Sequence, residues 1–268
     1  MTEESTAAVS TALTRVAVTR YVTPLREGGS LPGIVEADDL GTYVCKFRGA
    51  GQGLRVLVAE VIVAGLCRVL DIPTPDQVVL DLDPDLARYE ADEEVQALLS
   101  ASPGTNLGID FLAGAFGYDA GHRPDPDLAG RILWLDAFIA NVDRSWRNPN
   151  LLVWNGVLYA IDHGASLYFH HSWPGGPGSP ERFAAQPYDA GEHIMLAYAD
   201  RAVAQDADLT RRLTDTAVRE VVAAVPAEWL EPVPGAETPD ELRRRYESFL
   251  RARSTGDRRW LPTAGGAG

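Results

Sequence analysis

The stretch NVDRSWRNPNLLVWNGVLYAIDHG (residues 141–164) decides the fold that we predict for this chain. An Asn-Gly pair at positions 155–156 lies between two apolar arms, and this pair is the strongest two-residue signal for a tight β-hairpin. A short hairpin brings its two open ends together. We therefore expect Asp143 and Asn148, which precede the first arm, to lie beside Asp162, which ends the second.

Two carboxylates and an amide oxygen would then converge at one open end of the hairpin. Asp162 follows an apolar strand, where an ionised carboxylate is costly unless it is paired or holds a metal. Oxygen ligands of this kind suit Mg²⁺, which takes one or two protein carboxylates together with substrate phosphates. Taken singly, such residues are common in turns and caps, and we interpret Asn150 and Asn141 in that way. The combination D-R-x-x-x-N, hairpin, I-D-H-G is much rarer.

A lysine and a glutamate form the second part of the pattern. Lys46 lies in TYVCKFRG, which alternates as a strand does, and an exposed edge lysine is its plainer interpretation. Glu60 lies in LVAEVIVAGL, the most apolar helix predicted, where a buried glutamate needs a cation. Lys46 is the nearest candidate upstream. A strand lysine paired with a helix glutamate orients the lysine toward nucleotide phosphates in kinases, whereas Glu60 could alternatively reach solvent at the helix edge.

Two glycine-rich segments flank the lysine strand. The run at 49–53 could let backbone amides approach a phosphate or could be a flexible connection, but it is not a Walker sequence, because no Gly-Lys-Ser/Thr follows it. In two-lobed kinases the loop that covers the nucleotide precedes the lysine strand. The earlier turn, EGGSLPG at 27–33, is therefore our candidate for that loop, and Gly29 is the residue in it that we assign to nucleotide binding.

The order of predicted elements indicates an α+β protein with two lobes. We predict a β-rich N-terminal lobe at residues 1–104, a mainly helical C-terminal lobe with the hairpin at 105–256, and a flexible tail at 257–268. Helices are predicted at 54–70, 84–100, 127–140, 190–206, 208–224 and 239–253.

Composition narrows the class of protein. The chain has 268 residues, of which 46% are hydrophobic, and a net charge of −14, which argues against a nucleic-acid backbone as partner. Cys45 and Cys67 lack the spacing of metal ligands and are expected as buried, reduced thiols, which fits a cytoplasmic protein. No secretory signal and no membrane-spanning apolar run are apparent.

In this order, the residues resemble those of the HipA-like kinases, which share a protein-kinase-like fold with the phosphatidylinositol 3/4-kinases. Residues 44–75 resemble the run from the lysine strand through the glutamate helix to an Ile-Pro-x-Pro exit. Residues 141–152 resemble the catalytic loop, and the similarity covers most of residues 15–225. The chain would be a compact form without the extra N-terminal subdomain.

The resemblance implies a role for each residue of the catalytic loop and the hairpin end. Asp143 would accept or orient the proton of the attacking hydroxyl. Asn148 and Asp162 would bind Mg²⁺, and Arg144 would support the loop or the transferred phosphate. The sequence has His163 where ordinary protein kinases carry the Phe of Asp-Phe-Gly, and we expect this histidine to fix the geometry of the turn.

The function implied by the resemblance is ATP- and Mg²⁺-dependent phosphoryl transfer to a hydroxyl of a protein, peptide or small molecule. Lys46 would contact the α- and β-phosphates, and Glu60 would hold Lys46. One alternative is a catalytically silent nucleotide-binding pseudokinase or scaffold. A metal-dependent hydrolase is another, but it leaves the Lys46–Glu60 pair without a purpose. The sequence does not specify the acceptor.

Overall fold

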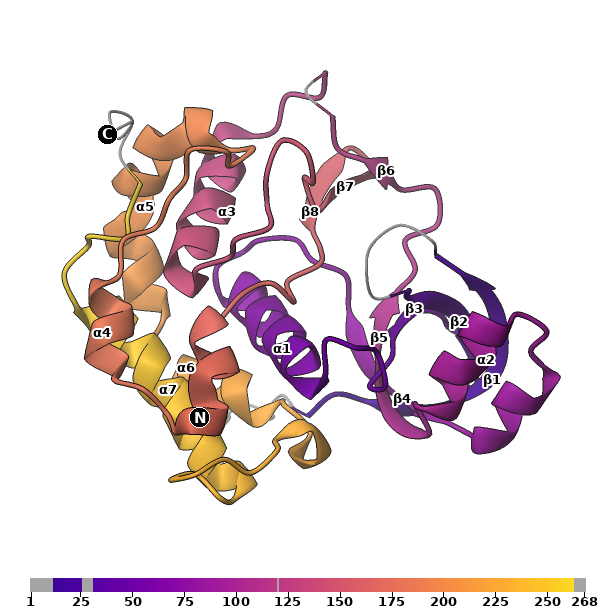
Figure 1. Ribbon diagram of the computed structural model, residues 1–268. Helices are drawn as coiled ribbons and strands as arrows, with labels where there is room; N and C mark the ends of the chain where they lie inside the picture. The colour runs from indigo at the N-terminus through magenta and orange to yellow at the C-terminus, as the bar shows by residue number, and fades with distance from the viewer. Residues whose placement is uncertain (1–11, 26–30, 120, 263–268) are drawn as a thin grey trace, which may run out of the picture.

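The computed structural model describes residues 12–25, 31–119 and 121–262. Within these residues, five strands close into a barrel in the order β1-β2-β3-β5-β4, shown in indigo to magenta in Figure 1. Neighbouring strands are antiparallel except that β1 runs parallel to β4, and this pairing closes the barrel. The strands are β1 (Arg15–Pro24), β2 (Gly33–Ala37), β3 (Thr42–Lys46), β4 (Gln77–Leu82) and β5 (Gly104–Asp110).

Side chains that alternate along the strands fill the barrel. In β2 and β3 every second residue is buried, including Val35, Tyr43 and Cys45, as the two-residue period of a strand requires. A 3₁₀ turn, η1 (Pro84–Tyr89), and helix α2 (Glu93–Ser100) pack on this core. Asp92 caps α2 with its side chain, so the helix predicted at 84–100 is interrupted.

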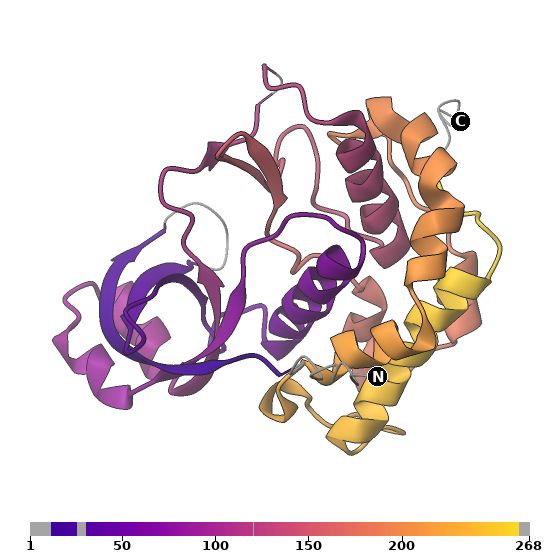
Figure 2. The same cartoon turned by 180° about the vertical axis from the view of Figure 1, so that it is seen from behind.

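Helix α1 (Leu54–Val69) lies between the barrel and the later helices (Figures 1 and 2). It is buried on almost every side, as its all-round apolar sequence predicts. Its side chains belong to the large core of the second half of the chain, separate from the core inside the barrel. Gly65 permits close packing on α6 (Asp215–Ala223), because a Cβ there would lie 2.8 Å from Val221 Cγ1.

The second half of the chain combines a small sheet with a set of helices. The sheet has the order β6-β7-β8, with β6 (Phe116–Gly117), β7 (Leu151–Trp154) and β8 (Val157–Ala160). The helices are α3 (Pro126–Ile139), α4 (Pro180–Ala185), α5 (Ala199–Arg212), α6 (Asp215–Ala223) and α7 (Pro239–Thr255), with short 3₁₀ turns η2 (Tyr168–Gly175), η3 (Leu196–Tyr198) and η4 (Ala227–Trp229). Helix α3 packs on α5, and α7 packs on α4 and α6.

The predicted α+β class, strand-rich first and helical afterwards, is confirmed. The structure differs at the predicted boundary, because residues 104–110 form strand β5, which pairs with both β3 and β4 inside the barrel. A single glycine-containing strand resembles a linker until its partners are known. Helix α5 also begins at 199 rather than 190, since residues 191–195 form turns and a β-bridge, and residues 196–198 form the 3₁₀ turn η3.

Residues 257–262 are packed against the protein, where we expected a flexible tail to begin. Trp260 is fully buried, and its ring contacts Trp134 and Phe138 at centroid distances of 5.2 and 5.7 Å. Arg258 binds Asp206 at 3.1 Å. Burial of a tryptophan therefore orders residues 257–262, and the rest of the predicted tail lies outside the described residues. No helix among those that the structure describes is long and apolar enough to cross a membrane.

Candidate active site

The hairpin has the geometry that its Asn-Gly pair predicts. Asn155 and Gly156 both adopt positive φ, at 50° and 78°, as a type I′ turn requires. The turn fixes the register, with Trp154 opposite Val157 and Leu151 opposite Ala160. The pairing continues past β8, since the Ile161 N–H donates to the Asn150 carbonyl at 3.0 Å. The residue after this last bond is Asp162.

Asp162 binds the predicted lysine. Its Oδ1 lies 2.6 Å from Lys46 Nζ, and the same ammonium group contacts Glu60 Oε1. Asp162 adopts φ 55°, a left-handed conformation that aspartate tolerates better than most residues. The structure thus contains the strand-lysine and helix-glutamate pair that the sequence indicates, joined to the carboxylate at the hairpin end.

Burial and opposite charges compete at this cluster. The Glu60 side chain is 1% exposed, and burial raises its pKa against the lowering effect of Lys46. Burial alone would lower the pKa of Lys46, but Glu60 and Asp162 outweigh it and raise the pKa. Lys46 likewise outweighs the effect of burial on Asp162 and lowers its pKa. Two carboxylates share one ammonium group, so the ionised cluster keeps a net negative charge.

A second cluster surrounds Asp143. Its Oδ2 accepts hydrogen bonds from Asn148 Nδ2 at 3.0 Å and from Asn150 Nδ2 at 3.2 Å, and its N–H donates to Asn141 Oδ1 at 3.0 Å. Asn150, which we interpreted as a turn residue only, therefore also orients Asp143. Because its carbonyl pairs with Ile161, Asn150 connects the cluster of Asp143 to the strand that ends at Asp162.

Arg144 is a buried support of the loop. Its Nε lies 2.5 Å from Asp136 Oδ2, both side chains are 1% exposed, and Nη1 donates to the Asn150 carbonyl. Asp136 also accepts from Asn141 Nδ2 at 2.8 Å and lies 3.0 Å from His193 Nε2. Burial raises the pKa of Asp136, but Arg144 outweighs it, and the pKa lies well below its ordinary value. Of the two roles predicted for Arg144, these contacts match support of the loop.

Sequence reasoning missed Asp136, although a signal was present. It lies in ILWLDAFIA, an apolar helical run with one ionisable residue, which is the same signal that identified Glu60. An ionised group in such a run requires a buried cation. Applied here, that rule would have indicated a partner for Asp136 from outside the helix.

His163 and Gly164 fix the turn that follows Asp162. His163 is buried, with Nε2 3.4 Å from Thr74 Oγ1 and Nδ1 3.4 Å from Arg144 Nη2. Burial, aided by Arg144, lowers the pKa of His163 to about 3, so the ring is neutral at pH 7. At Gly164 a Cβ would lie 2.5 Å from Val56 Cγ1 of α1. Only glycine allows the chain to pass this close to the glutamate helix.

The glycine-rich segments have different positions relative to the site. Gly29 lies outside the described residues, so its role in covering a nucleotide remains a prediction. The run at 49–53 connects β3 to α1. It is anchored where the Gly49 N–H donates to Ser102 Oγ at 3.1 Å, and Gly53, with φ 75°, precedes the first turn of α1.

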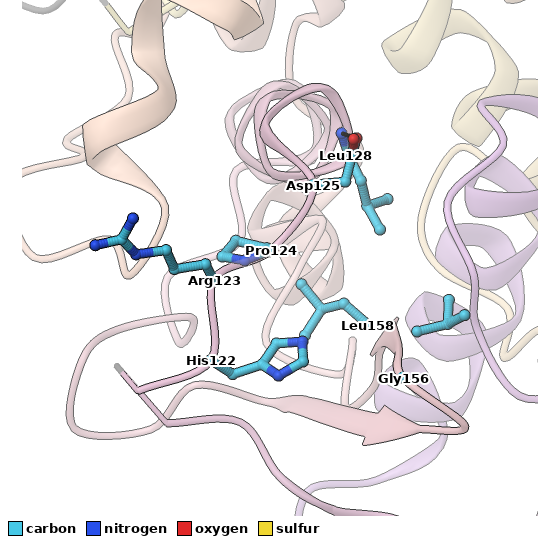
Figure 3. A pocket seen from close by; sticks show the side chains of 8 residues that line it. His122, Arg123, Pro124, Asp125, Leu128, Gly156 and Leu158 are labelled. Carbon is cyan, nitrogen blue, oxygen red and sulfur yellow. Dashed lines mark hydrogen bonds between the residues drawn. The ribbon is translucent and has the colours of Figure 1, made fainter.

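One cavity lies at the opposite end of the hairpin. It has a volume of about 170 Å³ and contains His122, Asp125 and Leu158 in its lining, as Figure 3 shows. Gly156 of the hairpin turn also lines it. Since Asp162 and Asn150 are at the open end of the same hairpin, this cavity is separate from the candidate site.

The fold and this arrangement of residues define a kinase family. The chain matches the HipA-like kinase family over residues 18–257 and belongs to it. Among solved structures, the chain is similar to the proinflammatory kinase CtkA of Helicobacter pylori, with a TM-score of 0.51, 9% identity, and coverage of 88% of this chain and 93% of that one. This likeness shows a kinase fold.

Weaker similarity extends to the Golgi casein kinase. One crystal structure of it gives a TM-score of 0.36 and 13% identity, covering 91% of this chain and 71% of that chain. Another, with Mn/ADP bound, gives 0.36 and 14%, covering 91% and 73%. No curated protein matches the sequence.

Proposed function

We propose that this HipA-like kinase is an ATP- and Mg²⁺-dependent phosphotransferase that moves the γ-phosphate to a hydroxyl group. The observation that carries the proposal is the position of Lys46 Nζ, which contacts Glu60 on one side and Asp162 on the other. A structural ion pair needs only one carboxylate. A lysine between two carboxylates, at the mouth of a loop with D-R-x-x-x-N, suits a phosphate site.

Lys46 supplies positive charge to the nucleotide phosphates in this proposal. Glu60 is buried and contacts Lys46, so it restricts the lysine to one position. Positioning and charge neutralisation account for most of the catalysis of phosphoryl transfer, and little covalent chemistry is required of the protein. The family assignment supports the same roles.

Asn148 and Asp162 have the donor chemistry that fits Mg²⁺. Within the described part of the chain, no group of three or more His, Cys, Asp or Glu side chains could hold a metal. Mg²⁺ needs no such group, because it keeps several waters and takes one or two protein oxygens besides the phosphates. The negative charge that remains around Asp162 favours a divalent cation. When bound, Mg²⁺ neutralises charge on the β- and γ-phosphates.

Asp143 accepts the proton of the attacking hydroxyl group. The acceptor oxygen forms a bond to the γ-phosphorus, the bond from that phosphorus to the β–γ bridging oxygen breaks, and ADP leaves. The hydroxyl proton passes to Asp143. Its Oδ2 is held by Asn148 and Asn150, so we assign Oδ1 to the acceptor hydroxyl.

Two further proposals concern partners and location. The net charge of −14 disfavours a nucleic-acid backbone as the acceptor. Cys45 and Cys67 are free, buried thiols, which suits the reducing cytoplasm.

The test is phosphate transfer from ATP with Mg²⁺ in the full chain, measured as ADP release and as phosphate incorporated into protein or added acceptors. We expect turnover in the wild type, loss of at least about a hundredfold in Asp143→Ala, and loss on chelation of Mg²⁺. Glu220→Ala, which removes an exposed carboxylate on α6, is the control and should keep turnover. Nucleotide binding without transfer would instead identify a silent nucleotide-binding module.

A further inference from the structure

A cavity of about 460 Å³ opens beside the loop that carries Asp143. One wall is the loop itself, which contributes Val142 and Ser145 on the two sides of Asp143. The other wall is the segment at 186–193, between α4 and η3. The volume falls within the range of about 300–1,000 Å³ that is typical of small-ligand sites.

The segment at 186–193 is bonded to the loop on both sides of Asp143. The Tyr188 hydroxyl donates to the Asn141 carbonyl at 2.8 Å. After Asp143, the Trp146 N–H donates to the Glu192 carbonyl at 3.2 Å, and Ser145 forms a β-bridge with His193. Main-chain and hydroxyl bonds of this kind preform the cavity, so a molecule bound there would have a fixed position relative to Asp143.

Two charged residues that line the cavity, Arg144 and Glu192, are each paired with a residue of opposite charge. Arg144 lines it but is buried against Asp136, which neutralises it. Arg147, outside the lining, binds both carboxylate oxygens of Glu192, at 2.8 and 2.9 Å.

Asp189 lies on the exposed rim. One of its oxygens accepts a bond from the Gly191 N–H at 2.9 Å, and no ion pair involves Asp189 in the described part of the chain. The uncompensated charge at this opening is therefore negative and comes from Asp189. Asp143 does not line the cavity, but both of its chain neighbours, Val142 and Arg144, do.

We propose that this cavity binds the phosphate acceptor and selects a hydroxyl compound that also carries an ammonium or guanidinium group. The hydroxyl lies toward Asp143 and the cation toward Asp189. The inference rests on the proposed function, since it assigns the acceptor of the same site. The net charge of −14 on the whole chain also attracts a cationic acceptor and repels an anionic one.

The first test measures binding without nucleotide, by calorimetry at low ionic strength. The probes are a serine peptide flanked by arginines and the same peptide flanked by glutamates, and, in a second arm, an amino alcohol and the matched uncharged diol. We expect the cationic member of at least one pair to bind preferentially. Asp189→Lys should weaken its binding roughly tenfold, and Asp189→Asn by roughly two- to fivefold.

Glu220→Lys is the matched control, because it makes the same charge change on α6, away from the cavity. Equal weakening by Glu220→Lys and Asp189→Lys would overturn the assignment, as would binding that prefers the neutral or anionic probe in both arms, or no binding of any probe. If the protein prefers the arginine-flanked peptide, the phosphate acceptor is a serine side chain beside basic residues. If it prefers the amino alcohol over the diol, the acceptor is a free amino alcohol.

Failure of this inference can be distinguished from failure of the proposed function. If the wild type transfers no phosphate but binds the cationic probe through Asp189, the proposed function fails and the cavity assignment stands. If the wild type transfers phosphate and Asp189→Lys leaves the KM of a cationic acceptor unchanged, the cavity assignment fails alone. The expected result is a higher KM of the cationic acceptor in Asp189→Lys and an unchanged KM in Glu220→Lys.

Discussion

Lys46 and Asp162 lie 116 positions apart in the sequence, and their side chains form an ion pair of 2.6 Å. The contact joins strand β3 of the barrel to the residue that follows the hairpin of the second half. Both residues reach it through local structure: Lys46 by strand alternation, and Asp162 by a left-handed turn after β8. Three predictions test how the surrounding residues maintain this arrangement, and a fourth concerns His170, which is buried against Tyr246 of α7.

Replacing Lys46 should reveal how strongly Glu60 depends on it. In Lys46→Met the Glu60 carboxylate stays buried without its cation, which should lower the free energy of unfolding by about 3–5 kcal/mol. The double variant Lys46→Met/Glu60→Gln should recover a large part of this loss, because the buried charge is gone. Urea unfolding measures both. Equal stability of the two variants would contradict the pairing.

Removing the Asp136 carboxylate, which pairs with Arg144, should destabilise the loop that carries Asp143. Asp136→Asn leaves a buried guanidinium without its carboxylate, and we expect a loss of about 3–5 kcal/mol in the free energy of unfolding, together with reduced phosphate transfer. Asp127→Asn is the control, since the Asp127–Arg201 ion pair is exposed and should contribute under about 1 kcal/mol. Similar losses in the two variants would show that the buried network does not support the loop.

A methyl group at Gly164 should push helix α1 away from the hairpin end. The Cβ of Gly164→Ala would lie 2.5 Å from Val56 Cγ1, so we expect a destabilisation of about 1–3 kcal/mol. Val56→Ala in the same chain should reverse much of it by removing the clashing methyl groups. Thermal unfolding with matched single variants measures the coupling, and purely additive effects would exclude the clash.

Low pH should destabilise the protein through His170. This residue is buried, its Nδ1 lies 3.0 Å from the Tyr246 hydroxyl, and burial, aided by His171 and Arg55, lowers its pKa well below the ordinary value. The unfolded chain therefore binds a proton near pH 6.5 that the folded chain does not, and stability falls as the pH drops below that value.

In His170→Leu the free energy of unfolding no longer includes the pH-dependent contribution of this histidine. The slope of unfolding free energy against pH between 6.5 and 5 should be smaller than in the wild type by up to about 1.4 kcal/mol per pH unit. His163 contributes in the same direction in both proteins and so cancels in the comparison. Identical slopes would show that His170 accepts its proton in the folded state.

Local signals in the sequence were sufficient for much of the fold and site. The Asn155-Gly156 pair specified both the turn and the register, because only residues that tolerate positive φ fit a type I′ turn. The position of Glu60 predicted a cationic partner, since a carboxylate in an apolar helix needs a nearby cation. In both cases a few neighbouring residues were sufficient for the prediction.

Other features depend on contacts between distant segments and could not be predicted in this way. The parallel pairing of β1 with β4 closes the barrel, and β5 inserts between β3 and β4, yet each strand alone has no preferred neighbour. The segment at 186–193 has no regular periodicity, and its structure comes from bonds to the loop that carries Asp143. Trp260 is ordered by rings in α3, over a hundred positions earlier.

Helix α1 packs into the core of the helical half, whereas Lys46 belongs to the barrel, which has its own interior. The ion pair between Lys46 and Glu60 therefore crosses from one separately packed body to the other. Because Lys46 Nζ contacts Glu60 of α1 and Asp162 at the hairpin end, a rotation of the barrel against the helices would displace the ammonium group relative to both carboxylates. The alignment of the barrel with the helical half therefore also sets the position of the ammonium group that we propose as the ligand of the nucleotide phosphates.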